Sequence, residues 1–286
     1  LPISDLGRVN LVSGSEVAID FTGDGLISFV VSEGTLVNGD GEDSAVANTG
    51  SIEGATVYLS ANAARDVFKN AVNNSGLIEA TGAYEENGVI VLEGGAGTTM
   101  NSGTLDASSA SGAGGSISML GDYVGVTDGA VISADGATGG GTILIGGNWQ
   151  GQGPEQNASR TYVGDAAISA DATVNGDGGM VVVWSDESTR FNGSITARGG
   201  ADSGDGGNVE VSGGALKFTG HVDTSADNGQ LGSLLLDPTN IVINSPGDTA
   251  DLAGTLNDDT DANTFAFDEG ETGTTTATIA ASVLDG

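Results

Sequence analysis

The sequence predicts an all-β solenoid, a parallel β-helix with coils of about 27 residues. Two columns of apolar residues recur at that interval, and 50 of the 286 residues are glycine, which suits tight turns between short strands. Each predicted strand is too short to form a core of its own, so each coil has to stack on the next. We therefore expect a rod built from stacked coils.

Charge and composition exclude several classes of protein. With 39 acidic and 7 basic residues the formal net charge is −32, which argues against binding to nucleic acid or anionic membranes. No apolar run approaches the roughly 18 residues of a membrane-spanning helix, so no membrane insertion is expected. The chain has no Cys and a single His, His221, which excludes disulfides, thiolate zinc sites and clusters of His ligands. Residues 1–10 lack the features of a signal peptide, so we expect any secretory signal to be removed already or to lie upstream.

The first column has a β-branched residue or Leu, then a polar residue, then Ala or Thr. Its apolar members are Ile78, Leu105, Ile132, Ile168, Ile195 and Val222, so successive steps are 27, 27, 36, 27 and 27 residues. The small third residue fits a narrow interior. One step is longer by nine residues, which fall near 148–160 and predict a loop that projects from one side of the rod.

The second column follows about ten residues later and alternates apolar with polar residues. A period of two predicts a strand with one buried face. Its apolar pairs, each preceded by glycine, are Ile90/Leu92, Ile117/Met119, Ile143/Ile145, Val181/Val183, Val209/Val211 and Leu234/Leu236. A third, weaker strand precedes the first column and contributes Met100, Tyr123/Val124, Tyr162/Val163, Phe191 and Phe218. Each coil is therefore expected to have three faces.

The two ends of the chain are less regular than its middle. We expect irregular β coils over residues 1–50, regular β-helix over 51–243, and an acidic loop with a strand-like tail over 244–286. Helix formers within 61–71 predict one short helix, and 276–284 predicts a strand or a short helix. Near the N-terminus the strand candidates, which do not follow the 27-residue step, are 9–12, 17–21 and 26–31.

Several stretches resemble a known family. They are GRVNLVSGSEVAIDFTGDGLISF (7–29), NAVNNSGLIEATG (70–82), GGTILIGGNWQGQG (140–153), NASRTYVGD (157–165), TRFNGSITARGG (189–200) and GSLLLDPTNIVI (232–243). Over roughly residues 7–243 the chain resembles the filamentous-haemagglutinin-type exoproteins, large adhesins of bacterial two-partner secretion systems. The resemblance implies a right-handed parallel β-helix and export through an outer-membrane transporter. It also implies a secreted or cell-surface fibre that acts in adhesion, aggregation or biofilm formation.

One motif of that family is missing. The family's secretion domain carries Asn-Pro-Asn-type motifs that the transporter recognises, whereas none of the four Pro residues here follows Asn. We therefore expect the chain to be an internal or processed segment, which begins at the end of the secretion domain or just after it.

An enzymatic role is the alternative to a structural one, because parallel β-helices also include enzymes that cleave polysaccharides. Such sites need paired carboxylates, often with a His, Arg or Lys nearby. The basic residues here are dispersed along the chain, and His221 is expected to be exposed. Arg190 and Lys217 lie one coil apart, which favours a surface ladder over a site. We predict no enzymatic activity and no catalytic residue, and keep a polysaccharide-binding or polysaccharide-degrading β-helix as the alternative function.

Acidic residues in glycine-rich loops could bind Ca²⁺ through oxygen ligands. The candidates are Asp202, Asp205, Glu210, Asp223, Asp227, Asp237 and the cluster Asp258, Asp259 and Asp261. The calcium-binding nonapeptide pattern is absent, so solvated acidic loops are the favoured interpretation. No cofactor is predicted, and a structural Ca²⁺ ion is the alternative.

Aromatic residues supply a candidate contact surface. Trp149 and Tyr162 flank the nine-residue insertion, and Trp184 faces outward by the alternation of its strand. Aromatic rings on an exposed loop can stack on sugar rings. The alternative, favoured for Trp149 and Tyr162, is that they pack the insertion against the rod. The expected partners are the transporter during export, and glycans or proteins on host or bacterial surfaces.

The open ends of a β-helix expose unpaired strand edges. No capping helix is evident at either end, so we expect either that the polypeptide continues, which is favoured, or that ends pair between molecules. Contacts of the second kind do not close and build a filament. The negative charge should confine such self-association to one dimension.

Overall fold

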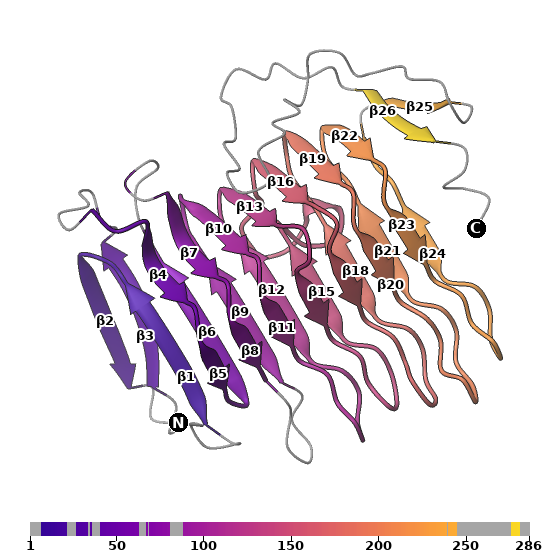
Figure 1. Cartoon of the computed structure of the whole chain (residues 1–286), viewed down its shortest axis with the longest axis horizontal. Coiled ribbons are helices and arrows are strands. Elements are labelled where there is room, and N and C mark those ends of the chain that lie inside the picture. Colours follow the sequence, from indigo (N-terminus) through magenta and orange to yellow (C-terminus); the bar gives the residue numbers. More distant parts are fainter. Residues whose placement is uncertain are drawn as a thin grey trace.

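The chain folds as a parallel β-helix, and the predicted fold class is confirmed. The computed structural model describes residues 7–21, 27–33, 35, 41–62, 67, 69–80, 88–238, 240–244 and 276–280. Three parallel sheets run along the length of the rod, and each coil contributes one strand to each of them (Figure 1). All strand pairs in these three sheets are parallel, as stacking of successive coils requires.

Sheet 1 contains the second column of the sequence. In spatial order its strands are β1 (Arg8–Ser13), β6 (Thr56–Ala61), β9 (Val89–Glu93), β12 (Ser116–Leu120), β15 (Thr142–Ile145), β18 (Met180–Val183), β21 (Asn208–Val211) and β24 (Ser233–Leu235). Ile117 aligns with Ile90 on one side and with Ile143 on the other. The alternation predicted from the sequence therefore places the inward residues of successive strands in rows that are buried from β6 to β21.

Sheet 2 contains the first column. Its strands, in chain order, are β5 (Ser51–Glu53), β8 (Leu77–Glu79), β11 (Thr104–Asp106), β14 (Val131–Ser133), β17 (Ala167–Ser169), β20 (Ser194–Thr196) and β23 (His221–Asp223). Ile132 aligns with Ile168 across the 36-residue step, because the nine extra residues lie outside the strands. Ile195 lies between Ile168 and Val222 and is completely buried, as the 27-residue step predicts.

Sheet 3 contains the third strand of each coil. From the N-terminal end its strands are β4 (Ser44–Asn48), β7 (Asn70–Asn74), β10 (Thr98–Asn101), β13 (Tyr123–Val126), β16 (Arg160–Val163), β19 (Ser188–Phe191), β22 (Ala215–Phe218), β26 (Thr276–Ala280) and β25 (Asn240–Asn244). Phe191 and Phe218 point into the rod, and their rings stack with centroids 5.3 Å apart. The three-faced coil predicted from the sequence is therefore confirmed.

Small residues are required where sheet 2 turns into sheet 1. Ala80 is completely buried at the end of β8, and a Cβ atom added at Gly88 would overlap the carbonyl oxygen of Ala80. The same overlap would occur between Gly141 and the carbonyl oxygen of Gly115 in the coil before it. The glycine that precedes each strand of sheet 1 from β9 to β24 thus permits a close approach of backbone to backbone, both within a coil and between coils.

Polar side chains also stack inside the rod. Asn48 Nδ2 donates a hydrogen bond to Asn74 Oδ1, and Asn74 Nδ2 donates one to Asn101 Oδ1; both bonds are 2.8 Å long. All three side chains are buried at equivalent positions of β4, β7 and β10. Buried amides are tolerated because each one is hydrogen-bonded to its copy in the next coil. The apolar columns of the sequence did not predict this ladder.

The N-terminal part differs from the regular coils in one element. β1 already belongs to sheet 1, where Val9 aligns with Val57. The next two strands, β2 (Glu16–Phe21) and β3 (Ile27–Glu33), form a separate antiparallel sheet. The three strand candidates near the N-terminus are confirmed, while the boundaries of the three predicted parts stay a prediction.

The predicted helix over 61–71 is not seen where the chain is described. Ala61 ends β6 and Asn70 begins β7, while 63–66 and 68 lie outside the described residues. In the tail, 276–280 is a strand and 281–284 lie outside the described residues. No helix within the described part of the chain is long and apolar enough to cross a membrane.

Replacing Ile195 by Asp tests the interior ladder. The substitution places a charge without a partner between Ile168 and Val222, and we expect it to lower the free energy of unfolding by about 4 kcal/mol or more. Ile195→Val is the matched control, with an expected loss of about 1 kcal/mol. Thermal unfolding followed by circular dichroism measures both. Melting of the Asp variant within a degree or two of the parent would contradict the register.

Candidate functional site

The insertion between β15 and β16 lies against the rod, where the sequence predicted a projecting loop. It contains a short 3₁₀-helix, η1 (Trp149–Gly151), and Asn148 Oδ1 accepts a hydrogen bond of 2.7 Å from the Trp149 N–H. At the far end of the insertion Gln156 Nε2 donates to the carbonyl oxygen of Gly95, over 3.0 Å. The first contact orders the start of η1, and the second ties the insertion to an earlier coil of the rod.

Trp184 is the residue on which the insertion packs. Its ring lies so close to the backbone that a Cβ atom added at Gly147 would be 2.8 Å from Cδ1, and one at Gly151 would be 2.5 Å from Cζ2. Trp184 Nε1 and Asn157 Nδ2 each donate a hydrogen bond of 3.0 Å to Asp186 Oδ1. The ring therefore anchors the glycine-rich start of the insertion, and it remains only partly exposed.

The structure separates the three aromatic residues of the predicted contact surface. Trp149 is half-buried in η1, in the same insertion that Trp184 contacts. Tyr162 lies instead on the outward face of sheet 3, where Arg190 Cζ is 5.7 Å from the centroid of its ring. A role of these three residues in binding stays a prediction.

Glu210, which the sequence offered only as a possible Ca²⁺ ligand, is a buried acid. The alternation of side chains along β21 points Glu210 away from the interior of the rod, yet its exposed fraction is 0%. Oε2 accepts a hydrogen bond of 2.7 Å from the Gln150 N–H of the insertion, and Oε1 accepts one of 2.9 Å from Ser212 Oγ. Gln150 has φ 55°, the single positive φ outside glycine in the described residues. Glu210 is therefore the point at which the sheet holds the tip of η1.

Burial raises the pKa of the Glu210 carboxyl. The nearby charge of Asp237 also raises it, whereas the hydrogen bonds from Gln150 and Ser212 lower it. Desolvation dominates because no cation faces this carboxyl among the groups that shift it. In the sequence, a glutamate between two apolar residues of a strand indicates an outward, solvated side chain. The pattern therefore could not predict that Glu210 is buried.

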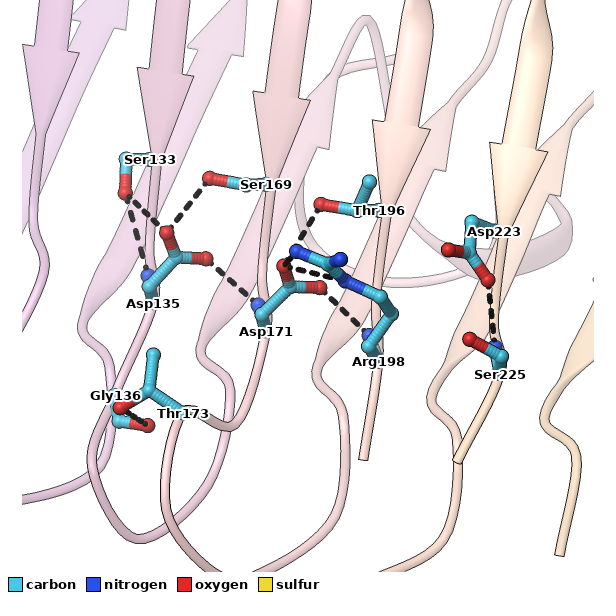
Figure 2. A network of polar contacts seen from close by, with 10 residues as sticks. All are labelled: Ser133, Asp135, Gly136, Ser169, Asp171, Thr173, Thr196, Arg198, Asp223 and Ser225. Atoms are coloured by element: carbon cyan, nitrogen blue, oxygen red, sulfur yellow. Dashed lines mark hydrogen bonds and ion pairs between the residues drawn. The ribbon is translucent and has the colours of Figure 1, made fainter. Parts of the chain in front are cut away.

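A second set of acidic residues joins the coils just beyond the C-terminal ends of the strands of sheet 2 (Figure 2). Asp135 Oδ1 accepts from the Asp171 N–H over 2.7 Å, and its Oδ2 accepts from Ser169 Oγ over 2.9 Å. One coil later, Asp171 Oδ1 accepts from the Arg198 N–H over 2.7 Å and its Oδ2 from Thr196 Oγ1 over 3.1 Å. Each carboxylate thus holds the backbone and the hydroxyl of the next coil in place.

Arg198 ends this ladder with an ion pair. Its Nη2 lies 2.6 Å from Asp171 Oδ2, and the hydrogen bond and charge of Asp171 raise the pKa of the guanidinium. In the following coil the pKa of Asp223 is lowered. Burial on its own would raise this pKa, but the hydrogen bonds from Ser225 and the charges of Arg198 and His221 outweigh burial. His221 itself is exposed, as predicted. The ladder is a structural device that repeats from coil to coil.

Arg190 and Lys217 occupy the positions that the 27-residue step gives them. They are aligned on neighbouring strands, β19 and β22, and point outward from sheet 3. No group of three or more Asp, Glu or His side chains within the described residues is arranged to hold a metal ion. Asp258, Asp259 and Asp261, which belong to the calcium hypothesis, lie outside the described residues.

Comparison with known proteins identifies a similar fold. No protein-family model and no curated protein matches the sequence. Among solved structures, the chain is similar to the HMW1 secretion domain from Haemophilus influenzae, with a TM-score of 0.60 and 28% sequence identity over 81% of this chain. The chain covers 57% of the length of that structure.

Glu210→Gln tests the cost of burying this charge. Because the pKa of Glu210 is raised in the folded chain, its contribution to stability is fully present below the ordinary value of 4.5 and is lost as the pH rises through the raised value. We therefore expect the variant to melt above the parent at pH 8, and the difference to disappear near pH 4. Asp202→Asn, at an exposed position, is the control with the same change of charge and should show no such difference. A Gln variant less stable than the parent at pH 8 would contradict this account.

Asp171→Ala tests the acidic ladder. The change removes the acceptor of both the Arg198 N–H and the guanidinium, and we expect a loss of about 2 kcal/mol in the free energy of unfolding. Urea unfolding measures the loss, with Asp202→Ala as a control that should stay within about 0.5 kcal/mol of the parent. Equal losses in the two variants would show that the ladder does not stabilise the stack.

Proposed function

We propose that the chain is a β-helical segment of a secreted, adhesin-like bacterial exoprotein of a two-partner secretion system. The observation that carries the proposal is the similarity, at 28% identity, to the HMW1 secretion domain from Haemophilus influenzae. The motif resemblance over roughly 7–243 supports the same class independently of the fold. The protein then acts at the cell surface or in the extracellular medium, and its partner during export is an outer-membrane transporter.

The physical properties of the rod suit export and folding outside the cell. A solenoid is stabilised by contacts between neighbouring coils, so it can fold by adding one coil at a time to those already formed. Parallel pairing of distant segments is intrinsically slow, which leaves a chain time to pass a pore before it folds. The absence of Cys and the net charge of −32 keep the unfolded chain free of disulfides and soluble.

In its finer form the proposal is adhesion, aggregation or biofilm formation without catalysis. The outward faces and the insertion would present contacts to glycans or proteins on host or bacterial surfaces, while end-to-end pairing would extend the rod. Carboxylates that a hydrolase would need, such as Asp135 and Asp171, are engaged in bonds between coils. This engagement favours a binding and structural role over a polysaccharide-degrading one.

A binding assay combined with a turnover assay tests the function. We expect the purified chain to clump bacterial cells or to bind a glycan or surface-protein array, and to release no reducing ends from acidic polysaccharides. Export is tested by placing the chain behind a signal peptide, with and without a two-partner transporter, and measuring its amount in the medium. Polysaccharide cleavage would contradict the non-catalytic proposal, and equal release with and without a transporter would contradict the export route.

A further inference from the structure

Sheet 3 departs from chain order at its C-terminal end. In sheet 1 the last two strands, β21 and β24, follow each other as successive coils do. The next strand along the chain after β24 is β25, so the coil order predicts that β25 stacks on β22 in sheet 3. Instead β26 lies between β22 and β25 and pairs with both (Figure 1). A strand from farther along the chain is thus inserted between two coils.

The spacing of the sequence assigns β25 to the place that β26 occupies. In sheet 1, Asn208 aligns with Ser233, a step of 25 residues. The same step from Ala215, the first residue of β22, leads to Asn240, the first residue of β25. Four residues join β24 to β25, as many as join β18 to β19 in a regular coil. Direct pairing of β25 with β22 therefore needs no unusual connection.

β25 keeps the register that direct pairing would have. Thr278 of β26 lies opposite Lys217 on one side and opposite Val242 on the other. Val242 is also the residue that the 25-residue step from Lys217 predicts. At the next position, β25 and β26 each place an Ile in line with Phe218, which is completely buried. The two strands thus offer equivalent positions, in the same direction, to the edge of β22.

The backbone edge of β22 that faces away from β19 is called the β22 edge below. A parallel ladder is made by backbone N–H and C=O groups, so it accepts any sequence that tolerates an extended backbone. β25 has the sequence NIVIN and β26 has TATIA, and both are rich in β-branched residues, which favour strands. Neither contains Pro or Gly. Each strand is therefore able to pair with the β22 edge.

We propose that the β22 edge is a strand-binding site with two exchangeable occupants from this chain. In the first state 276–280 occupies the edge, as described above. In the second state 240–244 pairs directly with β22, sheet 3 follows chain order, and 276–280 leaves the edge. Two packings of one sequence can have similar free energies, here because they use the same backbone edge in the same register. The exchange goes beyond the proposed function and acts as a conformational switch at this end of the sheet.

Disulfide trapping distinguishes the two states, because the chain has no Cys of its own. Neighbouring strands are about 4.8 Å apart and second neighbours about 9.6 Å apart. Only the first separation lies within the Cα distance that a disulfide spans, roughly 4.4–6.8 Å. Lys217→Cys/Thr278→Cys therefore reports the first state, and Lys217→Cys/Val242→Cys reports the second. We expect both variants to form an intramolecular disulfide in a glutathione buffer, and failure of the second while the first oxidises would overturn the proposal.

Two further cysteine pairs are the matched controls. Arg190→Cys/Lys217→Cys joins neighbouring strands, β19 and β22, and should form the disulfide in both states. Arg190→Cys/Thr278→Cys spans two strand spacings, as Lys217→Cys/Val242→Cys does in the first state, but it has β22 between its members and should form none. Equal yields from Arg190→Cys/Thr278→Cys and Lys217→Cys/Val242→Cys would indicate general opening of the sheet and would also overturn the proposal.

Proline substitutions should shift the exchange in opposite directions. Pro removes a backbone donor and is poorly tolerated in a strand with neighbours on both sides. Ala277→Pro should therefore release 276–280 and raise the rate of disulfide formation in Lys217→Cys/Val242→Cys roughly tenfold or more. Ile241→Pro should lower that rate by a similar factor and leave oxidation of Lys217→Cys/Thr278→Cys nearly unchanged. Equal rates with and without the two Pro residues would contradict the exchange.

Hydrogen exchange of the unmodified chain tests the switch without any substitution. The backbone amides of β22 are covered by one strand or the other in both states, whereas those of 276–280 lose their β22 partner in the second state. We expect 276–280 to exchange roughly tenfold faster or more than 215–218, as followed by mass spectrometry of peptides. Equal protection of the two strands would show that 276–280 does not leave the edge.

A second copy of the chain as the source of the strand gives a different outcome. Disulfides between molecules, with a yield that rises with protein concentration, would show exchange between chains and would overturn the intramolecular proposal. Disulfides within single chains, with a yield independent of concentration, would support it. Mass spectrometry of the oxidised variants separates the two results.

Discussion

The structure depends on backbone pairing between one coil and the next. Strands of three to six residues have no partner within their own coil, so each bonds to the equivalent strand before and after it. Equivalent positions therefore face one another along the rod, and a residue type that suits one coil is required in the next. The apolar ladder of Ile168, Ile195 and Val222, the buried Asn48, Asn74 and Asn101, and the Asp135 and Asp171 contacts are three expressions of this constraint.

Departures from the period are accommodated on the outside of the rod. The nine extra residues leave the pairing of β14 with β17 intact and are held on the surface by Trp184 and Glu210. Glu210 bears a cost, since its carboxylate loses hydration in exchange for two hydrogen bonds. An insertion that is docked so specifically adds a defined surface to one coil without disturbing the interior.

The interior of the rod specifies the fold, whereas the outward residues distinguish this chain from other β-helices. The proposed export and adhesin-like role rest on the similarity to the secretion domain of HMW1. The docking of the insertion depends on individual side chains that point outward, such as Glu210. A stack of short strands leaves these positions free to vary, because inward residues carry most of the packing energy.

The fold could be read from the sequence because stacking forces the period on every coil. The steps between Ile78, Leu105 and Ile132 gave the coil length, the alternation at Ile117 and Met119 gave the buried face, and the one long step located the insertion. The alternation of apolar and polar residues distinguishes inward side chains from outward ones, but it does not predict which segment covers an outward side chain. The burial of Glu210, the contact of Trp184 with Gly151, and the β2–β3 pairing depend on segments that meet only in the folded chain. Those features were decided by tertiary structure, because contacts between non-equivalent positions leave no repeat in the sequence.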